Sequence, residues 1–386
     1  MASWLSSKGH DVRVVTAPPY YPDWKVANGF RSTRYLTELV GGLKIFRCPL
    51  WVPAKPSGMK RLLHLLSFAI SSSPIMLRQV FWRPDIVWVV EPTFFCAPCA
   101  WVVARVCRAK AWLHIQDFEV DAAFDLGLLK GIFLKSTISF VEGRLLRNFD
   151  IVSTISHRML DRLSFKGVSV DKSTLFPNWV DISKITPGFQ GYAFRNELNI
   201  PASSLVALYS GNMGAKQGLD ILSEAASLLR DDRDLYFIFC GNGAGRTDLE
   251  NSCKGLNNVR FIDLQPPDRL SELLATADIH LLPQRADVAD LVMPSKLTGM
   301  LASGRPIVAT ARFGTEVARV VEGLGVVVQP EDPKAFAQAI SYLCENASLR
   351  KDFGVAARVY AENYLDKDAV LKLFEEKLMQ LNFGKN

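Results

Sequence analysis

Residues 208–229 read LYSGNMGAKQGLDILSEAASLL, and this stretch decides the fold. The pattern predicts a strand, a glycine-rich turn and an amphipathic helix whose apolar residues recur every three to four positions. Gly211 and Gly214 allow the backbone to approach a ligand closely, and Lys216 lies beside the free N–H groups that begin the helix. The turn predicts a phosphate site, with an ordinary strand-to-helix turn as the alternative. It is neither a Walker loop nor a dinucleotide fingerprint.

The same alternation of short apolar runs and helical patterns continues along the rest of the chain. Before the stretch, strands are expected at residues 12–16, 43–48, 85–90, 111–116, 150–155 and 173–178. In the second half they are expected at residues 205–211, 235–241, 259–263, 278–283, 306–310 and 325–330. This pattern predicts α/β architecture, with parallel sheets wrapped by helices on both faces and two doubly wound, Rossmann-like domains.

The boundaries follow from where the pattern restarts. We expect a first domain over residues 1–186, a second over 187–365, and a C-terminal helix over 366–386 that packs back on the first domain. The join at residues 183–195, SKITPGFQGYAFR, contains Pro and two Gly and has no apolar period, as a linker should.

The chain opens on a helix rather than on a central strand. Residues 2–8 look like the last turns of an amphipathic helix, Gly9 like its C-cap, and VRVVT at 12–16 like a second strand. The first strand and its turn, about 20–30 residues by the size of a βα unit, are therefore expected to be missing. A topology that needs no such strand is the alternative.

Composition and charge limit the function classes. With 49% hydrophobic and 22% charged residues the chain is globular, and residues 1–190 carry a net charge of +10 against −4 for the rest. The basic half suits an anionic surface or a phosphorylated acceptor near the first domain. Because zinc spacings, RNA-binding aromatic motifs and long basic runs are absent from the sequence, we expect no nucleic acid partner.

Seven cysteines are too few and too irregular for a disulfide scaffold, which indicates a reducing, cytoplasmic location. Cys96-Ala-Pro-Cys99 copies the spacing of redox motifs, with packing on a buried helix as the alternative. The sequence does not open with a signal-peptide pattern, and Ile86 to Cys107 divides into a strand, a loop and a helix rather than one membrane span.

Residues 59–83 are apolar, with basic side chains near both ends. Such a stretch could lie in the interface of an anionic leaflet, or it could pack against the sheet as core.

Two further segments point at the same sheet edge as the first glycine turn. FCGNGAGR at 239–246 follows the next strand, and its Gly241 and Asn242 are expected at the shared crevice. In MPSKLTGM, at 293–300, Pro294 and Ser295 suit the opening of a helix, so the N–H groups near Ser295, Lys296 and Leu297 are expected to point at that crevice. Two lysines and a helix end fit a diphosphate.

The order of these motifs resembles the C-terminal half of retaining GT-B glycosyltransferases. GHDVRVVTAPPYYPDWK, HIQDFEVDAAF and LFPNWVDISKI in the first half are similar to colanic-acid-type exopolysaccharide glycosyltransferases of bacteria. The resemblance implies a hexosyl transferase that uses a nucleotide-diphosphate sugar as co-substrate, with no cofactor and no metal. It also implies a saccharide acceptor, usually on a polyprenyl diphosphate, and peripheral binding to the cytoplasmic face of the inner membrane. A nucleotide-sugar epimerase and a degenerate, non-catalytic sugar-nucleotide-binding subunit are the alternatives.

The resemblance also assigns roles to residues of this sequence. Lys216 and Lys296 would stabilise the leaving diphosphate, and Asp117 would contact the acceptor hydroxyl or the reacting sugar. The residues expected to bind the donor are Gly211, Asn212, Gly214, Lys216, Gln217, Gly241, Asn242, Ser295, Lys296, Leu297, Thr315 and Glu316.

The sequence departs from the family pattern at three positions. Asn212 stands where the family usually has an arginine, and Leu291 and Gly299 stand where it commonly has two glutamates that contact sugar and ribose. We expect Glu316 or Asp290 to replace part of that function.

Acidic residues crowd the end of the strand at 111–116. Asp117, Glu119 and Asp121 are expected on the acceptor side, with His114 as a second choice and solvated loop acids as the alternative. His114 itself is expected to pack in the core. Asp232-Arg233-Asp234 imitates a metal-binding pair of acids but is expected to be a solvated turn.

Overall fold

The computed structural model describes residues 1–21, 24–54, 58–91, 94–118, 120–121, 124, 132–187, 191–214, 217–286 and 293–383. The chain groups into two units, one made of Met1–Phe176 with Leu371–Asn386 and the other of Pro177–Val370.

The first unit contains two sheets. A three-stranded sheet has the order β1 (Arg13–Thr16), β3 (Leu43–Arg47), β2 (Leu36–Val40), in which β1 and β3 are parallel and β2 is antiparallel. A four-stranded parallel sheet has the order β4 (Ile86–Glu91), β5 (Lys110–Ile115), β6 (Ile151–Thr154), β7 (Ser173–Leu175). The predicted strands of the first half are confirmed, whereas the sequence analysis missed β2. β1 and β4 each lie at the end of a sheet.

Capping residues mark ends of two helices in the first unit. Ser156 caps α6 by accepting a hydrogen bond from the Met159 N–H at 3.3 Å, and Gly9 takes a φ of +93° just after Lys8, the C-cap of α1. Ile86 to Cys107 forms β4, η2 and α3, as predicted, rather than one span. The elements are α1 (Ala2–Ser7), α2 (Gly58–Arg78), η1 (Gln79–Phe81), η2 (Phe94–Cys96), α3 (Ala97–Cys107), α5 (Ile132–Arg147), α6 (His157–Phe165), η3 (Val170–Lys172) and α15 (Lys367–Phe383).

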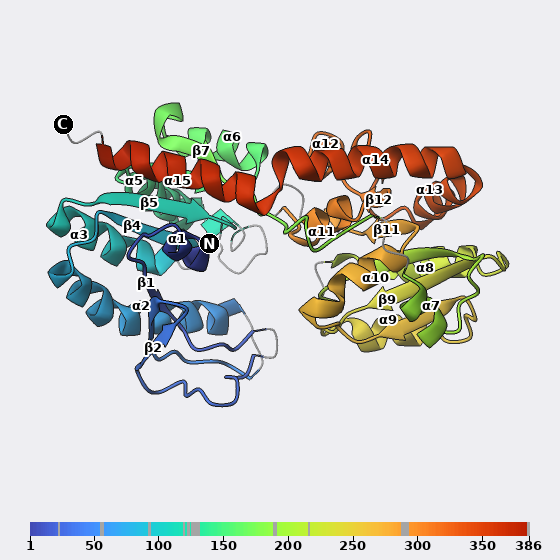
Figure 1. Ribbon diagram of the computed structural model, residues 1–386, viewed down its shortest axis with the longest axis horizontal. Coiled ribbons are helices and arrows are strands. Elements are labelled where there is room, and N and C mark those ends of the chain that lie inside the picture. The colour runs from blue at the N-terminus through green and yellow to red at the C-terminus, as the bar shows by residue number, and fades with distance from the viewer. Residues whose placement is uncertain are drawn as a thin grey trace. The chain divides into compact units, whose positions relative to one another are not determined.

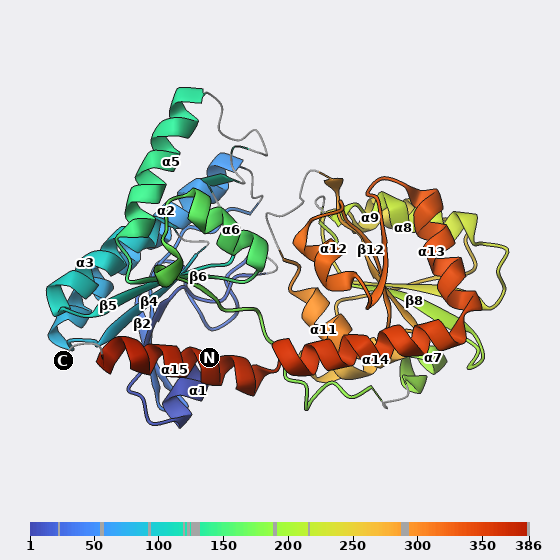
Figure 2. The ribbon, with the colours of Figure 1, turned by 90° about the horizontal axis from the view of Figure 1, so that it is seen from above.

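The last helix, α15, lies along the four-stranded sheet in both views (Figures 1 and 2). Phe374 of α15 is 3% exposed, and its ring centroid lies 4.8 Å from that of Trp112 and 4.5 Å from that of Phe176. These contacts explain why Leu371–Asn386 group with the first unit although the sequence places them last.

The second unit holds one parallel sheet of order β10-β9-β8-β11-β12-β13. Its strands are β8 (Leu205–Ser210), β9 (Leu235–Cys240), β10 (Val259–Ile262), β11 (Ile279–Leu282), β12 (Ile307–Thr310) and β13 (Gly325–Val328), as the sequence predicts. Its helices are α7 (Tyr192–Glu197), α8 (Asp220–Leu228), α9 (Arg246–Ser252), η5 (Pro267–Arg269), α10 (Leu270–Thr276), α11 (Lys296–Ala302), α12 (Glu316–Val321), α13 (Pro333–Glu345) and α14 (Ala347–Tyr364).

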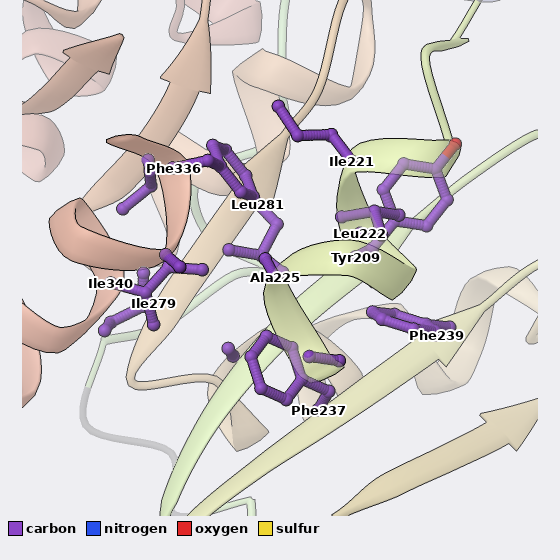
Figure 3. Packing of buried hydrophobic residues seen from close by; sticks show 14 of the residues in the cluster. Tyr209, Ile221, Leu222, Ala225, Phe237, Phe239, Ile279, Leu281, Phe336 and Ile340 are labelled. Atoms are coloured by element: carbon purple, nitrogen blue, oxygen red, sulfur yellow. The ribbon is translucent and has the colours of Figure 1, made fainter. Parts of the chain in front are cut away.

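Alternate residues of the central strands serve opposite faces of this sheet, which is why the strands are apolar throughout. Tyr209 and Phe237 pack with α8 and α13 in the cluster of Figure 3. Leu208 and Ile238 pack on the other face with Phe194 of α7 and Leu273 of α10. The doubly wound architecture predicted from the sequence is confirmed here.

The division between the units comes after Phe176, about ten residues before the join expected from sequence. The Val180 N–H donates to the Leu365 carbonyl at 2.9 Å, and the Lys367 N–H donates to the Val180 carbonyl at 3.0 Å. These hydrogen bonds tie residues 177–187 to the end of α14, so they group with the second unit.

Candidate functional site

Two glycine turns pack against each other at the carboxyl edge of the second sheet. Gly211 follows β8, and Gly241 follows β9 with a φ of +152°, a conformation that favours glycine. A Cβ on Gly241 would overlap the carbonyl oxygen of Gly211. The Met213 N–H also donates to the Asn242 carbonyl at 2.9 Å. The predicted meeting of the two turns is therefore present, and glycine at 241 serves their packing.

Lys296, the first residue of α11, reaches the first turn. Its Cδ lies 3.4 Å from the place that a Cβ on Gly211 would take. Its Nζ donates to Gln217 Oε1 at 3.2 Å and lies 4.2 Å from the centroid of the Tyr209 ring. The predicted convergence of the α11 end and the glycine turn is thus confirmed for Lys296, Gln217 and Gly211. Lys216 lies outside the described residues.

The ammonium of Lys296 is poorly solvated. Desolvation lowers the pKa of Lys296 from 10.5 to about 7. Within the described ranges no carboxylate forms an ion pair with it; the ring face of Tyr209 and the amide of Gln217 are its partners. An anion that arrives beside this nitrogen would favour its charged form, which is the property expected of a diphosphate-binding lysine.

A cavity of about 550 Å³ adjoins Lys296, a volume within the roughly 300–1,000 Å³ typical of ligand sites. The described residues that line it belong to the second unit, among them Trp179, Ser210, Pro267, Asp268, Ser271, Ser295, Thr298 and Gly299. Sequence reasoning placed Ser295 here but missed Pro267, Asp268 and Ser271. Their signal was the QPPDRLS segment, which follows the third strand of the sheet as the glycine turns follow the first two.

The start of α11 offers fewer free N–H groups than expected. The Leu297 N–H donates to the Pro294 carbonyl at 3.0 Å, and the Leu297 side chain is fully buried. The expectation that the Leu297 N–H points into the crevice is wrong, because that hydrogen is already engaged in the turn that opens the helix. Ser295 precedes α11 as predicted but makes no side-chain capping hydrogen bond.

Other predicted donor residues have structural partners. The Asn242 side chain accepts from Arg246 Nη1 at 2.5 Å, and the Asn212 carbonyl accepts from the Tyr209 hydroxyl at 2.7 Å. A Cβ on Gly214 would stand 3.3 Å from Asn212 Nδ2. Arg246, which sequence reasoning overlooked, also donates to the Gly241 carbonyl at 2.9 Å and so holds the second turn.

Thr315 and Glu316 open α12. The Thr315 hydroxyl accepts from the Ala318 N–H at 3.4 Å and caps the helix. Glu316 is 6% exposed and forms an ion pair with Arg319. Asp290 and Leu291 lie outside the described residues, whereas Gly299 lines the cavity beside Lys296.

In the first unit, His114 is a core residue of β5. It is 2% exposed, its Nδ1 lies 2.8 Å from Ser153 Oγ, and its Nε2 lies 2.8 Å from Gln116 Nε2. Burial lowers the pKa of His114 to about 4, so it is neutral at physiological pH. The prediction that His114 packs in the core is confirmed, and its second-choice role on the acceptor side stays a prediction.

The acids after β5 have different surroundings. Asp121 is buried and accepts from Arg162 Nε at 2.7 Å and from Lys166 Nζ at 3.1 Å. Lys166 also pairs with Glu142, so Asp121 belongs to an ion network between helices. Asp117 lies two residues after the end of β5 and is partly buried, and Glu119 lies outside the described residues.

The described ranges hold no candidate metal site, no helix suited to span a membrane and no disulfide. No group of three His, Cys, Asp or Glu side chains is close enough there to hold a metal ion. None of the helices described has both the length and the apolar character that a membrane-crossing helix requires. All seven cysteines are free thiols, including Cys96 and Cys99. Asp232 accepts from the Asp234 N–H at 3.0 Å in an exposed turn.

Comparison with protein families identifies two matching segments. Residues 1–179 match the family described as glycosyl transferase 4-like domain, and residues 192–360 match glycosyl transferases group 1. The chain is 43% identical, over 97% of its length and 93% of the relative's, to a protein of Escherichia coli (strain K12) named as the colanic acid biosynthesis glycosyl transferase WcaI.

Solved structures show the same fold at low identity. Sucrose-phosphate synthase from Thermosynechococcus elongatus is 16% identical with a TM-score of 0.75, over 100% of this chain and 92% of that one. HepE of Anabaena, solved in complex with UDP and glucose, is 17% identical with a TM-score of 0.65, over 88% of this chain and 86% of that one.

Proposed function

The chain belongs to the GT-B glycosyltransferases of colanic acid and exopolysaccharide biosynthesis, and from this premise we propose that it moves a hexosyl group from a nucleotide-diphosphate sugar to a lipid-linked saccharide. We propose retention of configuration at the anomeric carbon. The observation that carries the proposal is Lys296: one partly desolvated cation at the meeting point of two glycine turns, a helix start and a cavity.

The proposed sugar transfer is a front-face displacement in which every bond and proton is accounted for. An acceptor oxygen forms a bond to the anomeric carbon while the bond from that carbon to the diphosphate oxygen breaks. The acceptor proton passes to an oxygen of the leaving diphosphate. The protein's main task is then to stabilise negative charge on the diphosphate, which we assign to Lys296 together with Lys216 in place of a metal ion.

The nucleoside half of the donor would occupy the cavity beside Lys296. Pro267 and Leu270 offer apolar surface for a base, and Ser271, Thr298 and Asp268 offer polar groups for a sugar. Gly299 contributes no carboxylate there, so the function of the absent glutamate must come from elsewhere. We keep Glu316 as its replacement; unchanged donor affinity in Glu316→Gln would refute that assignment.

A lipid-linked acceptor requires the enzyme to reach a membrane surface, and α2 carries side chains suited to binding such a surface. Exposed apolar residues recur along this helix at a spacing of about one turn or its multiples, namely Met59, Leu63, Leu66, Ile70 and Leu77. Lys60, Arg61 and Arg78 stand exposed on the same helix. This exposure favours peripheral binding to the cytoplasmic leaflet of the inner membrane over core packing.

The test is donor binding and turnover by the full chain and its Lys296→Gln variant. UDP-glucose and GDP-sugars are titrated by calorimetry, and nucleotide release is followed with and without membrane extract as the source of acceptor. We expect Lys296→Gln to lower kcat/KM by about 10²–10³-fold, as losses of electrostatic stabilisation do. Lys254→Gln, an exposed lysine of the same unit, is the matched control.

The outcomes separate the rival functions. Nucleotide release that depends on acceptor supports transfer. A changed nucleotide sugar formed without acceptor would indicate an epimerase, and binding without turnover would indicate a non-catalytic subunit. Equal activity in Lys296→Gln and Lys254→Gln would remove the proposed role of Lys296.

A further inference from the structure

A second cavity lies in the second unit at the opposite edge of its sheet. It has a volume of about 360 Å³ and is lined by Asp278 and Pro306, which directly precede β11 and β12, and by one side of α14 from Ala347 to Val359. Lys296 and the glycine turns lie at the carboxyl edge. The two cavities share no lining residue, so the second is a separate site.

Positive charge dominates this cavity. Arg305, Arg350, Lys351 and Arg358 line it, and among the described lining residues Asp278 is the one carboxylate. Asp278 is already neutralised, because its Oδ2 accepts from Arg195 Nη2 at 2.7 Å and from a main-chain N–H at 2.8 Å. The cavity therefore presents an excess of cations to whatever enters it.

Two of the arginines are held in place mostly by neutral groups. Arg350 donates to two main-chain carbonyls of α13 at 2.5 and 2.7 Å. Arg358 donates to the carbonyls of Ile185 and Ala302 at 2.5 and 2.8 Å and also pairs with Glu362 at 2.7 Å. Carbonyl partners fix a guanidinium without cancelling its charge, so Arg350 keeps its positive charge in the cavity, whereas Glu362 offsets part of the charge of Arg358.

The other two cations, Arg305 and Lys351, have donor groups that the described residues do not engage. The Nε of Arg305 is buried and has no hydrogen-bond partner among the described residues. Lys351 is exposed and forms no ion pair with a carboxylate in those ranges. The long helix α14 also begins here with Ala347, and its N-cap Asn346 makes no side-chain capping hydrogen bond. Unused donors from the loop before β12 and from α14 thus converge on one cavity.

We propose that this cavity binds the phosphate group of a small phosphorylated metabolite, at a site separate from that of the donor. Guanidinium groups match phosphate oxygens in geometry and charge. The volume stands near the lower limit of about 300 Å³ for ligand pockets, which suits a sugar phosphate better than a whole nucleotide sugar. The proposal does not depend on the proposed function, because no residue of the donor site takes part.

The test is calorimetric titration of the full chain with glucose 6-phosphate, inorganic phosphate and, as an uncharged control, glucose. We expect both phosphates to bind and glucose not to bind. In the double variant Arg305→Gln/Lys351→Gln the affinity should fall by about tenfold or more. In Lys334→Gln, an exposed lysine on α13, and in Lys296→Gln at the donor site the affinity should stay within about twofold of the wild type.

Each other result would overturn the proposal. Equal affinity in the double variant and the wild type would remove the cavity as the binding site. Loss of binding in Lys296→Gln alone would assign the phosphate to the donor site. Vesicles containing phosphatidic acid distinguish a lipid headgroup: vesicle binding that depends on Arg305 and Lys351, without binding of free phosphates, would contradict a small metabolite. The single variant Lys351→Gln, at an exposed position, guards against a double variant that fails to fold.

Discussion

At the residue scale, Lys296 connects burial to the pH dependence of binding. Its pKa is lowered to about 7 by desolvation, so at about pH 8 most of its amine is neutral in the free protein. A bound diphosphate favours the ammonium, and binding of UDP-glucose should therefore take up a proton. Calorimetry in two buffers that differ in ionisation enthalpy measures this uptake. Buffer dependence that persists in Lys296→Met would assign the proton to another group.

The lowered pKa of Lys296 also determines whether the free energy of unfolding rises or falls with pH. Between about pH 7 and pH 10.5 the unfolded chain holds the Lys296 proton and the folded chain does not, so the contribution of this residue to the free energy of unfolding rises with pH. Below about pH 7 the contribution is constant. Denaturant unfolding gives the free energy of unfolding of Lys296→Met and of the wild type at each pH. The value for the variant minus the value for the wild type should decrease from pH 7 to pH 9.

Gly241 gives a stability prediction that does not involve charge. Gly241→Ala would place a Cβ on the Gly211 carbonyl in a backbone conformation that disfavours any side chain, and we expect a loss of about 3–4 kcal/mol. Gly255→Ala is the matched control, since Gly255 has a φ of +83° but open space around it. That variant should lose only the backbone strain, about 1–2 kcal/mol. Equal losses would mean that the contact between the turns is unimportant.

At the element scale, the exposed apolar residues of α2 predict membrane binding. Flotation with anionic vesicles at low salt should recover the full chain, and Leu63→Glu/Ile70→Glu should reduce the floated fraction by about tenfold or more, because two charges would enter the leaflet interface. Leu228→Glu, an exposed apolar residue on α8 of the second unit, should float like the wild type. Failure of the wild type to float would refute the membrane role of α2.

The sequence predicted elements well where one local signal was enough. Buried parallel strands are continuous apolar runs, and each predicted run became a strand. β2 was missed because it is a largely exposed edge strand whose side chains show no apolar run. Its signal was the Gly41-Gly42 pair, both with positive φ, between β2 and β3, which is typical of a tight hairpin.

The site was predictable in outline and not in its contacts. Glycine turns and a lysine at a helix start are local patterns, so Gly211, Gly241 and Lys296 were found. The Tyr209 ring beneath Lys296 depends on which face of β8 that tyrosine takes, and the cavity depends on how η5 and α10 stand against α11. Such relations between distant segments require tertiary packing, which spacing along one sequence does not encode.

At the scale of the whole molecule, the order of segments in the sequence differs from their grouping into folding units. Most of the basic half of the chain and the exposed apolar face of α2 belong to the first unit, whereas the candidate diphosphate site and both cavities belong to the second. The proposed surface attachment and the proposed donor binding are thus assigned to different units. Only the C-terminal helix departs from this order, because it follows the second unit in sequence and packs in the first.

A chain that ends at Val370 tests this division. It lacks Leu371, Phe374 and Leu378, which are at most 9% exposed, and at about 1.5–3 kcal/mol for each buried side chain the first unit should lose its cooperative unfolding transition. All tryptophans except Trp179 lie in the first unit, so tryptophan fluorescence follows that unit. Calorimetry with UDP-glucose follows the second unit, where the affinity should stay within about twofold of that of the full chain.

Phe374→Ala should lower the fluorescence midpoint of unfolding in the full chain, while Leu373→Ala, at a 66% exposed position of the same helix, should leave that midpoint unchanged. An unaltered fluorescence transition in the shortened chain would show that α15 contributes little to the first unit, and a lost affinity would show that the second unit depends on it.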